Sequence, residues 1–305
     1  MRVAVVYVIR VAIAVIVLAN ILYYVPPTRL FVLYAVGRAG PCPLGKAVHA
    51  FGTMSKRVAI QNRLDADKKL IEIDPAGYHL LQTGMGRYWV PARNDGVLTD
   101  NLAEQATQVY GDAEDGVHRG DVVFDCGANV GVYTRVALAA GAKLVVAVEP
   151  APEDVECLRR NFAAEIGQGR VIVVPKGVWD REDTLVLFED AGSSARDSFV
   201  GSWGPAVRQT RVPLTTIDRL VEELKLDSVD FIKMDIEGAE KRALAGSQNT
   251  LRKFHPRMAI STEHLLDDPV AIPRTIHDIA PGYRVLCGDC IDAISRVRPD
   301  VLFFR

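Results

Sequence analysis

Acidic residues follow several apolar, β-prone runs in this 305-residue chain. Each of them stands at or directly after the end of such a run: Asp125, Glu149, Asp235 and the pair Glu263-His264. In open α/β sheets, ligands bind outside the carboxyl ends of the strands. A crevice that carries several carboxylates there suits a positively charged ligand. His264 can titrate near neutrality, so we predict that it acts as a general base, with Asp235 as the competing candidate.

A glycine-rich turn follows the first of these runs. Asp125 begins the pattern Asp-x-Gly-x-x-x-Gly, which places Gly127 and Gly131 between a strand and a helix. Glycines let a backbone approach a ligand closely, and free N–H groups at a helix start attract polar ligand groups. Glu149 follows Gly127 by 22 residues. A carboxylate at that strand tip can accept hydrogen bonds from both hydroxyls of a ribose, so the unit is predicted to bind a nucleoside.

The fingerprint of dinucleotide-binding proteins, Gly-x-Gly-x-x-Gly, is absent from this turn. Ala128 and Asn129 follow Gly127, and the next glycine is Gly131. A looser turn around an uncharged nucleoside is therefore favoured over a pyrophosphate cradle. This spacing disfavours an NAD-dependent oxidoreductase.

Strand-like and helix-like segments alternate from Asp121 onward. Alternation of this kind predicts an α/β fold whose mostly parallel sheet is covered on both faces. Expected strands are 122–125, 144–149, 171–174, 229–234, 258–262, 283–286 and 301–304, with extra strands at 184–188 and 210–214. Expected helices are 130–140, 152–164, 216–224, 239–254 and 272–280.

Three runs carry a resemblance to a known family. The run 124–134, FDCGANVGVYT, resembles the first motif of FkbM-type class I methyltransferases, which bind S-adenosylmethionine (SAM). The run 233–240, KMDIEGAE, resembles a second signature of that family, and the run 212–218, VPLTTID, is also similar to it. The resemblance extends roughly from Leu80 to Arg305.

The resemblance implies a Rossmann-like class I methyltransferase sheet whose last two strands form an antiparallel hairpin. It also implies SAM as the cofactor. Asp125 would approach the methionine part, the glycines of the turn would admit the cofactor backbone, Glu149 would hold the ribose, and the segment 177–180 would flank the adenine. The expected cofactor-binding residues are Asp125, Gly127, Asn129, Gly131, Glu149 and Asp180.

The implied reaction is O-methyl transfer, an in-line displacement that mainly requires alignment and removal of a proton. Asp235 would lie beside the reactive methyl, and the loop 192–194 would close over the substrate. Glu237 and Glu240 begin a helix, where acids also serve as capping residues. The expected acceptor is a hydroxyl of a glycan, a lipid-linked saccharide or a small metabolite. The alternative is a non-catalytic subunit, with this fold, of a larger membrane complex.

The N-terminal region contains no Asp or Glu before Asp65. Its residues 3–25 are almost wholly apolar, interrupted by Arg10 and Asn20, and a helix of this length can span a bilayer. We therefore predict a single-pass anchor, in which Arg10 either extends its charged end toward the membrane surface or faces a partner helix. More basic residues follow the span than precede it, which places the catalytic domain on the cytoplasmic or an equivalent side. The missing acids leave a mitochondrial inner membrane open as an alternative.

The predicted organisation has three parts. Residues 1–27 form the transmembrane anchor, 28–70 form a basic juxtamembrane connector, and 71–305 form the methyltransferase domain. Within that domain, 71–118 form an N-terminal lid and 119–305 the SAM-binding core. A hairpin is expected over 78–90 and a helix over 101–110 in the lid.

The composition excludes some classes of function. A net charge of −2 and a hydrophobic content of 49% allow a sizeable core and argue against nucleic acid as a partner. The five cysteines are an odd number, so no disulfide scaffold is expected. Cys287 and Cys290 form a lone CxxC motif, for which we predict two thiols near a late strand. No metal site is predicted.

Overall fold

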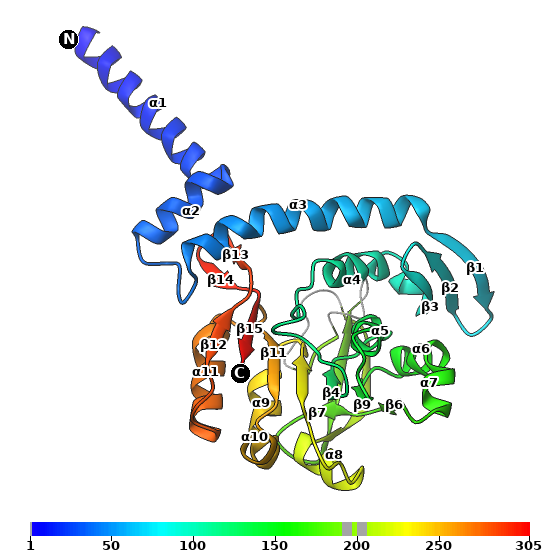
Figure 1. Ribbon diagram of the computed structural model, residues 1–305. Helices are drawn as coiled ribbons and strands as arrows, with labels where there is room; N and C mark the ends of the chain where they lie inside the picture. The colour runs from blue at the N-terminus through cyan, green and yellow to red at the C-terminus, as the bar shows by residue number, and fades with distance from the viewer. Residues whose placement is uncertain (1, 191–196, 200–205) are drawn as a thin grey trace.

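A seven-stranded sheet forms the centre of the computed structural model, which describes residues 2–190, 197–199 and 206–305 (Figure 1). Its strand order is β12-β15-β11-β10-β4-β5-β6. The strands are β4 (Val122–Cys126), β5 (Leu144–Val148), β6 (Val171–Val174), β10 (Phe231–Met234), β11 (Arg257–Ser261), β12 (Val285–Cys287) and β15 (Val301–Phe304). Every side chain of β4 and β10 is buried, as expected for strands that are covered on both faces.

The sheet changes winding direction at β4. This strand pairs in parallel with β5 on one side and with β10 on the other, and β10 pairs in parallel with β11. Such a switch point opens a crevice at the carboxyl ends of the strands. β15 runs antiparallel to both β11 and β12. The predicted α/β fold, with a mostly parallel sheet and a closing antiparallel hairpin, is therefore confirmed.

Helices cover both faces because alternate strand residues point to opposite sides. On one face, Val123 and Val145 pack with helix α5, and Ala147 packs with helix α6. On the other face, Phe124 and Val146 share a core with helices α8 to α11. The helices that follow the strands are α5 (Val132–Ala139), α6 (Pro152–Asn161), α7 (Ala163–Gly167), α8 (Ile217–Glu223), α9 (Glu240–Ala245), α10 (Gln248–Phe254) and α11 (Asp268–Ile279). The single helix expected over 239–254 is interrupted at Gly246 and Ser247.

A second small sheet lies beside the core. The expected extra strands form β8 (Asp183–Asp190) and β9 (Ala206–Thr215), which pair antiparallel, while the two-residue β7 (Gly177–Val178) pairs in parallel with β9. A hairpin of β13 (Cys290–Asp292) and β14 (Val297–Pro299) was not predicted.

The region predicted as a lid contains an antiparallel sheet and helix α4 (Val97–Ala106), which begins four residues before the expected start. The sheet consists of β1 (Lys69–Asp74), β2 (Tyr78–Thr83) and β3 (Gly86–Pro91), followed by the short helix η1 (Ala92–Asn94). The hairpin expected over 78–90 is the β2–β3 pair. Asn161 on α6 anchors β3, because it accepts a hydrogen bond from the Trp89 N–H (2.7 Å) and donates one to the Trp89 carbonyl (3.0 Å).

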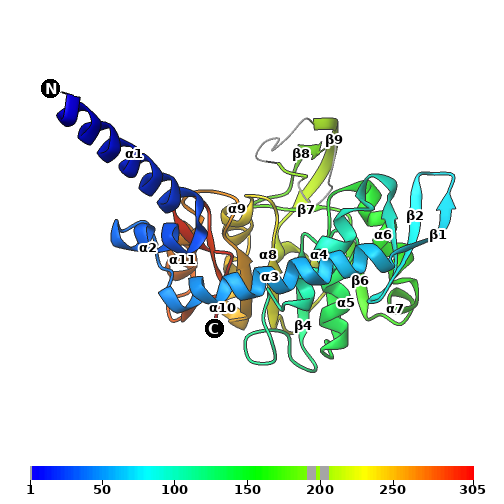
Figure 2. The ribbon, with the colours of Figure 1, turned by 90° about the horizontal axis from the view of Figure 1, so that it is seen from above.

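The segment before the lid is mostly helical. It contains α2 (Pro26–Ala35) and the long helix α3 (Leu44–Asp67), where the sequence analysis expected a connector. Figures 1 and 2 both show α3 running across the domain from the α2 side to the β1–β3 sheet. α3 packs against α4 and β13, and Arg57 forms an ion pair with Glu104 of α4 at 2.8 Å.

Helix α1 forms over Arg2–Tyr24, within the stretch predicted to be an anchor. In the part of the chain that the structure describes, however, no helix is long and apolar enough to cross a membrane. The predicted transmembrane anchor over 3–25 is therefore not supported.

The cysteine prediction is corrected by the structure. Cys42 and Cys290 form a disulfide across 248 residues of chain. This bond lies in an apolar cluster with Leu30, Leu33 and Val297, so it joins the N-terminal segment to the β13–β14 hairpin. Cys287, the other member of the CxxC motif, is a partly exposed free thiol. The pairing could not be deduced from spacing because the two half-cystines come from opposite ends of the chain.

Candidate active site

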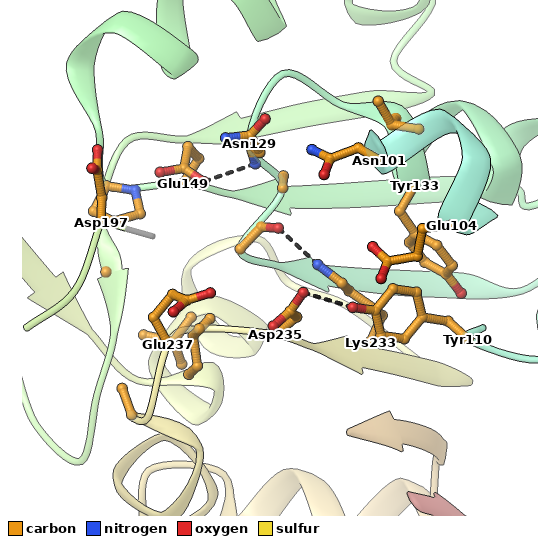
Figure 3. A pocket seen from close by; sticks show the side chains of 18 of the residues that line it. Asn101, Glu104, Tyr110, Asn129, Tyr133, Glu149, Asp197, Lys233, Asp235 and Glu237 are labelled. Atoms are coloured by element: carbon orange, nitrogen blue, oxygen red, sulfur yellow. Dashed lines mark hydrogen bonds between the residues drawn. The ribbon is translucent and has the colours of Figure 1, made fainter. Parts of the chain in front are cut away.

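An open cleft lies beyond the carboxyl ends of β4, β5 and β10 (Figure 3). It encloses about 830 Å³ of space, including solvent at its mouth. Its walls come from the loops after these strands, from β7, and from α4 with the loop that follows it. Four of the residues predicted to be catalytic or cofactor-binding line it: Gly127, Asn129, Glu149 and Asp235.

Gly127 is required at the floor of the cleft for two reasons. Its φ of +78° lies in the left-handed region, and a Cβ built on it would overlap the carbonyl oxygen of Asp235. The Gly127 N–H donates to the Val148 carbonyl at 3.0 Å. The turn after β4 is therefore packed directly against the residues that follow β5 and β10.

Gly131 has a different role from the one expected. Its φ is +93°, and a Cβ there would overlap the Phe162 ring and lie 2.9 Å from the Leu158 side chain. Gly131 is not in the cleft lining. It allows the start of α5 to approach α6 closely.

Glu149 is a buried carboxylate with only 6% of its surface exposed. Its two oxygens accept hydrogen bonds from the backbone N–H groups of Asn129 (2.8 Å) and Ala151 (2.9 Å). Asn129 adopts a φ of +48°, and its side-chain amide donates to Asp154 at 3.0 Å. Burial raises the pKa of Glu149 to about 7, against the lowering effect of the two backbone donors. A ligand hydroxyl that donates to this carboxylate would favour its charged form.

Asp125 lies below the cleft lining and is fully buried. It accepts a hydrogen bond from Thr134 at 2.7 Å and forms an ion pair with Lys233 at 3.4 Å. The Lys233 ammonium also donates to the carbonyl of Gly127 at 2.7 Å. Asp125 therefore supports the glycine turn from beneath. The positive charge beside it is the Lys233 ammonium of the protein itself.

Asp235 stands at the end of β10 and faces the cleft (Figure 3). Its Oδ2 accepts a hydrogen bond from the Tyr110 hydroxyl at 2.6 Å. Burial acts to raise the pKa of Asp235, but the charges of Lys233 and His264 and the Tyr110 hydrogen bond outweigh it, so the pKa is lowered. Asp235 is therefore an ionised carboxylate in the wall of the cleft.

His264 lies among three carboxylates, with its side chain 7% exposed. Its Nε2 is 3.4 Å from Asp235 Oδ1 and 3.2 Å from Glu237 Oε1, and its Nδ1 is 3.1 Å from Glu240 Oε1. Burial acts to lower the pKa of His264, but hydrogen bonds to Glu237 and Glu240 and the surrounding negative charge raise it to about 12. The His264 imidazole is therefore in its positively charged, protonated form at neutral pH. The expectation that it titrates near neutrality is wrong, because the sequence does not reveal its carboxylate neighbours.

The segment expected to flank an adenine divides into two parts. Gly177 and Val178 line the cleft, whereas Asp180 does not. Asp180 instead forms ion pairs with Arg242 (2.7 Å) and Arg181 (3.4 Å). The loop 192–194, expected to close over a substrate, lies outside the described residues.

Several lining residues were not assigned from the sequence. Lys233 had a visible signal, because it is the only charged residue within the apolar strand β10 and must find a buried partner. No sequence signal pointed to Tyr110, since it follows α4 in a stretch without a motif. Others in this group come from α4 and the loop before β9: Asn101, Glu104, Gln105, Asp197 and Phe199.

Comparison with known proteins identifies a domain. Residues 125–279 match the sequence model described as the methyltransferase FkbM domain. A curated Arabidopsis thaliana protein, tRNA wybutosine-synthesizing protein 2/3/4, is 26% identical over 179 residues. The match covers 48% of this chain and 18% of that protein, so the chain spans less than a fifth of the relative's length.

The solved structures that are similar to this chain include two of low sequence identity. Methyltransferase FkbM from Methylobacillus flagellatus KT is 17% identical, with a TM-score of 0.47 and coverage of 85% of this chain and 60% of that one. Trm5b from Pyrococcus abyssi is 16% identical, with a TM-score of 0.38 and coverage of 78% and 55%.

Proposed function

Because the matched domain covers half of the sequence, the chain belongs to the FkbM methyltransferase family, and we propose that it transfers the SAM methyl group to a hydroxyl oxygen of a saccharide or other small metabolite. Methyl transfer with SAM as donor follows from the family. The oxygen nucleophile and the class of acceptor are the proposed parts.

The residues of the cleft fit SAM. Glu149 offers a buried carboxylate to ribose hydroxyls, and Gly127 leaves room where any side chain would collide with the backbone. Gly177 and Val178 add an uncharged wall beside Phe199. When bound, SAM supplies a methyl group on a positively charged sulfur, which keeps the electron pair when the methyl carbon bonds to the acceptor oxygen.

Asp235 is the single observation that carries the proposal of an oxygen acceptor. A hydroxyl must lose its proton as it attacks, and the proton needs an acceptor within hydrogen-bond reach. Asp235 is ionised, faces the cleft, and is held in place by the Tyr110 hydroxyl. His264 is surrounded by carboxylates and carries a proton, so we assign proton removal to Asp235 and a supporting position to His264.

The remaining lining supports an acceptor rich in hydroxyl groups. α4 contributes Asn101, Glu104 and Gln105, and the loop after β10 contributes Glu237. These amide and carboxylate groups can donate to or accept from several hydroxyls at once. A saccharide, free or linked to a lipid, presents such groups, whereas an anionic acceptor would be repelled by the ionised Asp235.

The test combines cofactor binding with turnover. The full chain is incubated with SAM and a panel of saccharides, lipid-linked saccharides and small polyols, and S-adenosylhomocysteine and methoxy products are detected by mass spectrometry. We expect S-adenosylhomocysteine to be released with at least one hydroxylated acceptor. Asp235→Asn should still bind SAM but lose about 10²–10⁴-fold in rate, the usual contribution of a positioned acid or base. The matched control Asp227→Asn changes an exposed residue and should keep full activity.

Two outcomes would refute the proposal. If the folded protein binds SAM but releases no S-adenosylhomocysteine with any acceptor, a non-catalytic subunit becomes the better account. If the product carries the methyl group on nitrogen or carbon, the oxygen acceptor is wrong.

A further inference from the structure

We propose that Asp235, Glu237 and His264 form a binding site for a divalent transition-metal cation at the wall of the active-site cleft. The sequence analysis predicted no metal site. The proposal of metal binding rests on the geometry and charge of these residues, whereas the role we give the cation rests on the proposed function. Figure 3 shows the carboxylates of Asp235 and Glu237 at the same wall of the cleft.

The three side chains already have the spacing of a coordination shell. One ligand atom from each residue lies within 4.8 Å of the other two. His264 Nε2 is 3.4 Å from Asp235 Oδ1 and 3.2 Å from Glu237 Oε1. Ligand atoms that surround a cation at about 2.1 Å are separated by about 3.0–3.5 Å in octahedral or tetrahedral geometry. A cation could therefore enter between these atoms with little rearrangement.

Glu240 occupies the position of an outer-shell partner. Its Oε1 lies 3.1 Å from His264 Nδ1 and also accepts the Ile236 N–H at 3.0 Å. Metal-binding histidines usually donate their second ring N–H to a carboxylate, which fixes the tautomer and directs the free nitrogen to the metal. Glu240 thus holds the imidazole so that Nε2 faces Asp235 and Glu237, where a bound cation would take the place of the Nε2 proton and release it to solvent.

A second observation indicates that a positive ligand is needed. Glu240 is fully buried, and its Oε2 has no hydrogen-bond partner. Three carboxylates therefore surround a single imidazole. Glu263 and Asp300 add further carboxyl groups near Asp235, and Lys233 and Arg57 offset part of the negative charge. Excess buried negative charge is unfavourable unless a cation compensates it.

The chemistry of the ligand set narrows the choice of metal. Two carboxylates suit hard cations, and an imidazole nitrogen suits borderline metals, so the combination favours Mn²⁺, Fe²⁺ or Zn²⁺ over Ca²⁺. Three protein ligands leave positions open for a substrate. At the wall beside Asp235, a bound cation would hold the acceptor hydroxyl and lower its pKa, and the released proton would pass to the Asp235 oxygen that does not face the cation. An acceptor with two adjacent oxygens would fill two open positions.

Direct Mn²⁺ binding tests the proposal without reference to catalysis. The full chain is freed of metal by dialysis against a chelator and titrated with MnCl₂, with free Mn²⁺ followed by electron paramagnetic resonance. We expect one tight Mn²⁺ site per chain. Glu237→Gln, which preserves side-chain volume, should weaken binding at least about tenfold, as should His264→Gln. The matched control Glu222→Gln alters a side chain that is 69% exposed and should bind like the wild type.

Two results would overturn the proposal: a folded wild-type protein that does not bind Mn²⁺, or the same affinity in Glu237→Gln and Glu222→Gln. Thermal unfolding of each variant separates loss of a ligand from loss of the fold. SAM titration of the same metal-free preparation separates this proposal from the proposed function. SAM binding and methyl transfer that persist without Mn²⁺ binding would refute only the metal site. Mn²⁺ binding without methyl transfer to any acceptor would support the metal site and refute the proposed function.

Discussion

SAM affinity should depend on pH through Glu149. This carboxyl group is almost fully buried, and burial raises its pKa to about 7 from an ordinary value of 4.5. Ribose hydroxyls donate hydrogen bonds, which the ionised carboxylate accepts best. If the ionised form is the binding form, the apparent Kd at about pH 6, one unit below the pKa, should be about tenfold higher than its plateau above about pH 8. That factor corresponds to about 1.4 kcal/mol of binding free energy.

The sign of the stability effect of Glu149 is the opposite of that of a salt-bridged acid. Because its pKa is raised in the folded protein, the folded state holds more protons than the unfolded state between about pH 4.5 and 7. Glu149 therefore stabilises the fold most when it is protonated, and this contribution is lost as the pH rises through about 7. The ligand-free protein should lose stability over a range in which its affinity for SAM improves.

Isothermal titration calorimetry with SAM at several pH values between about 6 and 8 measures the effect. Glu149→Gln cannot titrate, so its affinity should be lower at about pH 8 and should vary less with pH. Glu104 also lines the cleft, and burial raises its pKa to about 8, so Glu104→Gln serves as the comparison that separates the two groups. A wild-type affinity that is constant over this range, or an equal pH dependence in Glu149→Gln, would show that Glu149 does not hold the ribose.

Three further predictions concern the framework of the site. Gly127→Ala should lower the free energy of unfolding in urea by about 2 kcal/mol or more. The control Gly120→Ala, where φ is +92° but the space around the residue is open, should lower it by only about 1 kcal/mol. Equal losses in the two variants would refute the close approach of Gly127 to Asp235. Lys233→Met leaves Asp125 buried without its cation and should cost about 3–5 kcal/mol, and adding Asp125→Asn should restore part of that stability. Cys42→Ser should lower stability by about 2–5 kcal/mol under oxidising conditions, and reductant should remove the difference from wild type.

Much of the central fold could be predicted from local patterns. The apolar runs ending at Asp125, Glu149 and Asp235 are strands in the structure, and β6 has the predicted bounds. Parallel strands bring their carboxyl ends to one edge, so the strand pattern alone places residues that are distant in sequence in one crevice. The order of the sheet required the family motifs, because periodicity does not specify which strands are neighbours.

Only the tertiary structure decided the electrostatics of the site and the attachment of the N-terminal segment. Lys233 in the lining of the cleft pairs with the buried Asp125, Tyr110 reaches Asp235, and three carboxylates surround His264. The protonation state of a side chain depends on charges within a few ångströms. In this site those charges belong to elements that are far apart in the sequence, and no sequence pattern predicts that they meet. The same reason applies to the Cys42–Cys290 disulfide, which joins opposite ends of the chain. The sequence by itself thus determined which chemical groups meet at the edge of the sheet, and folding determined the charges that those groups carry.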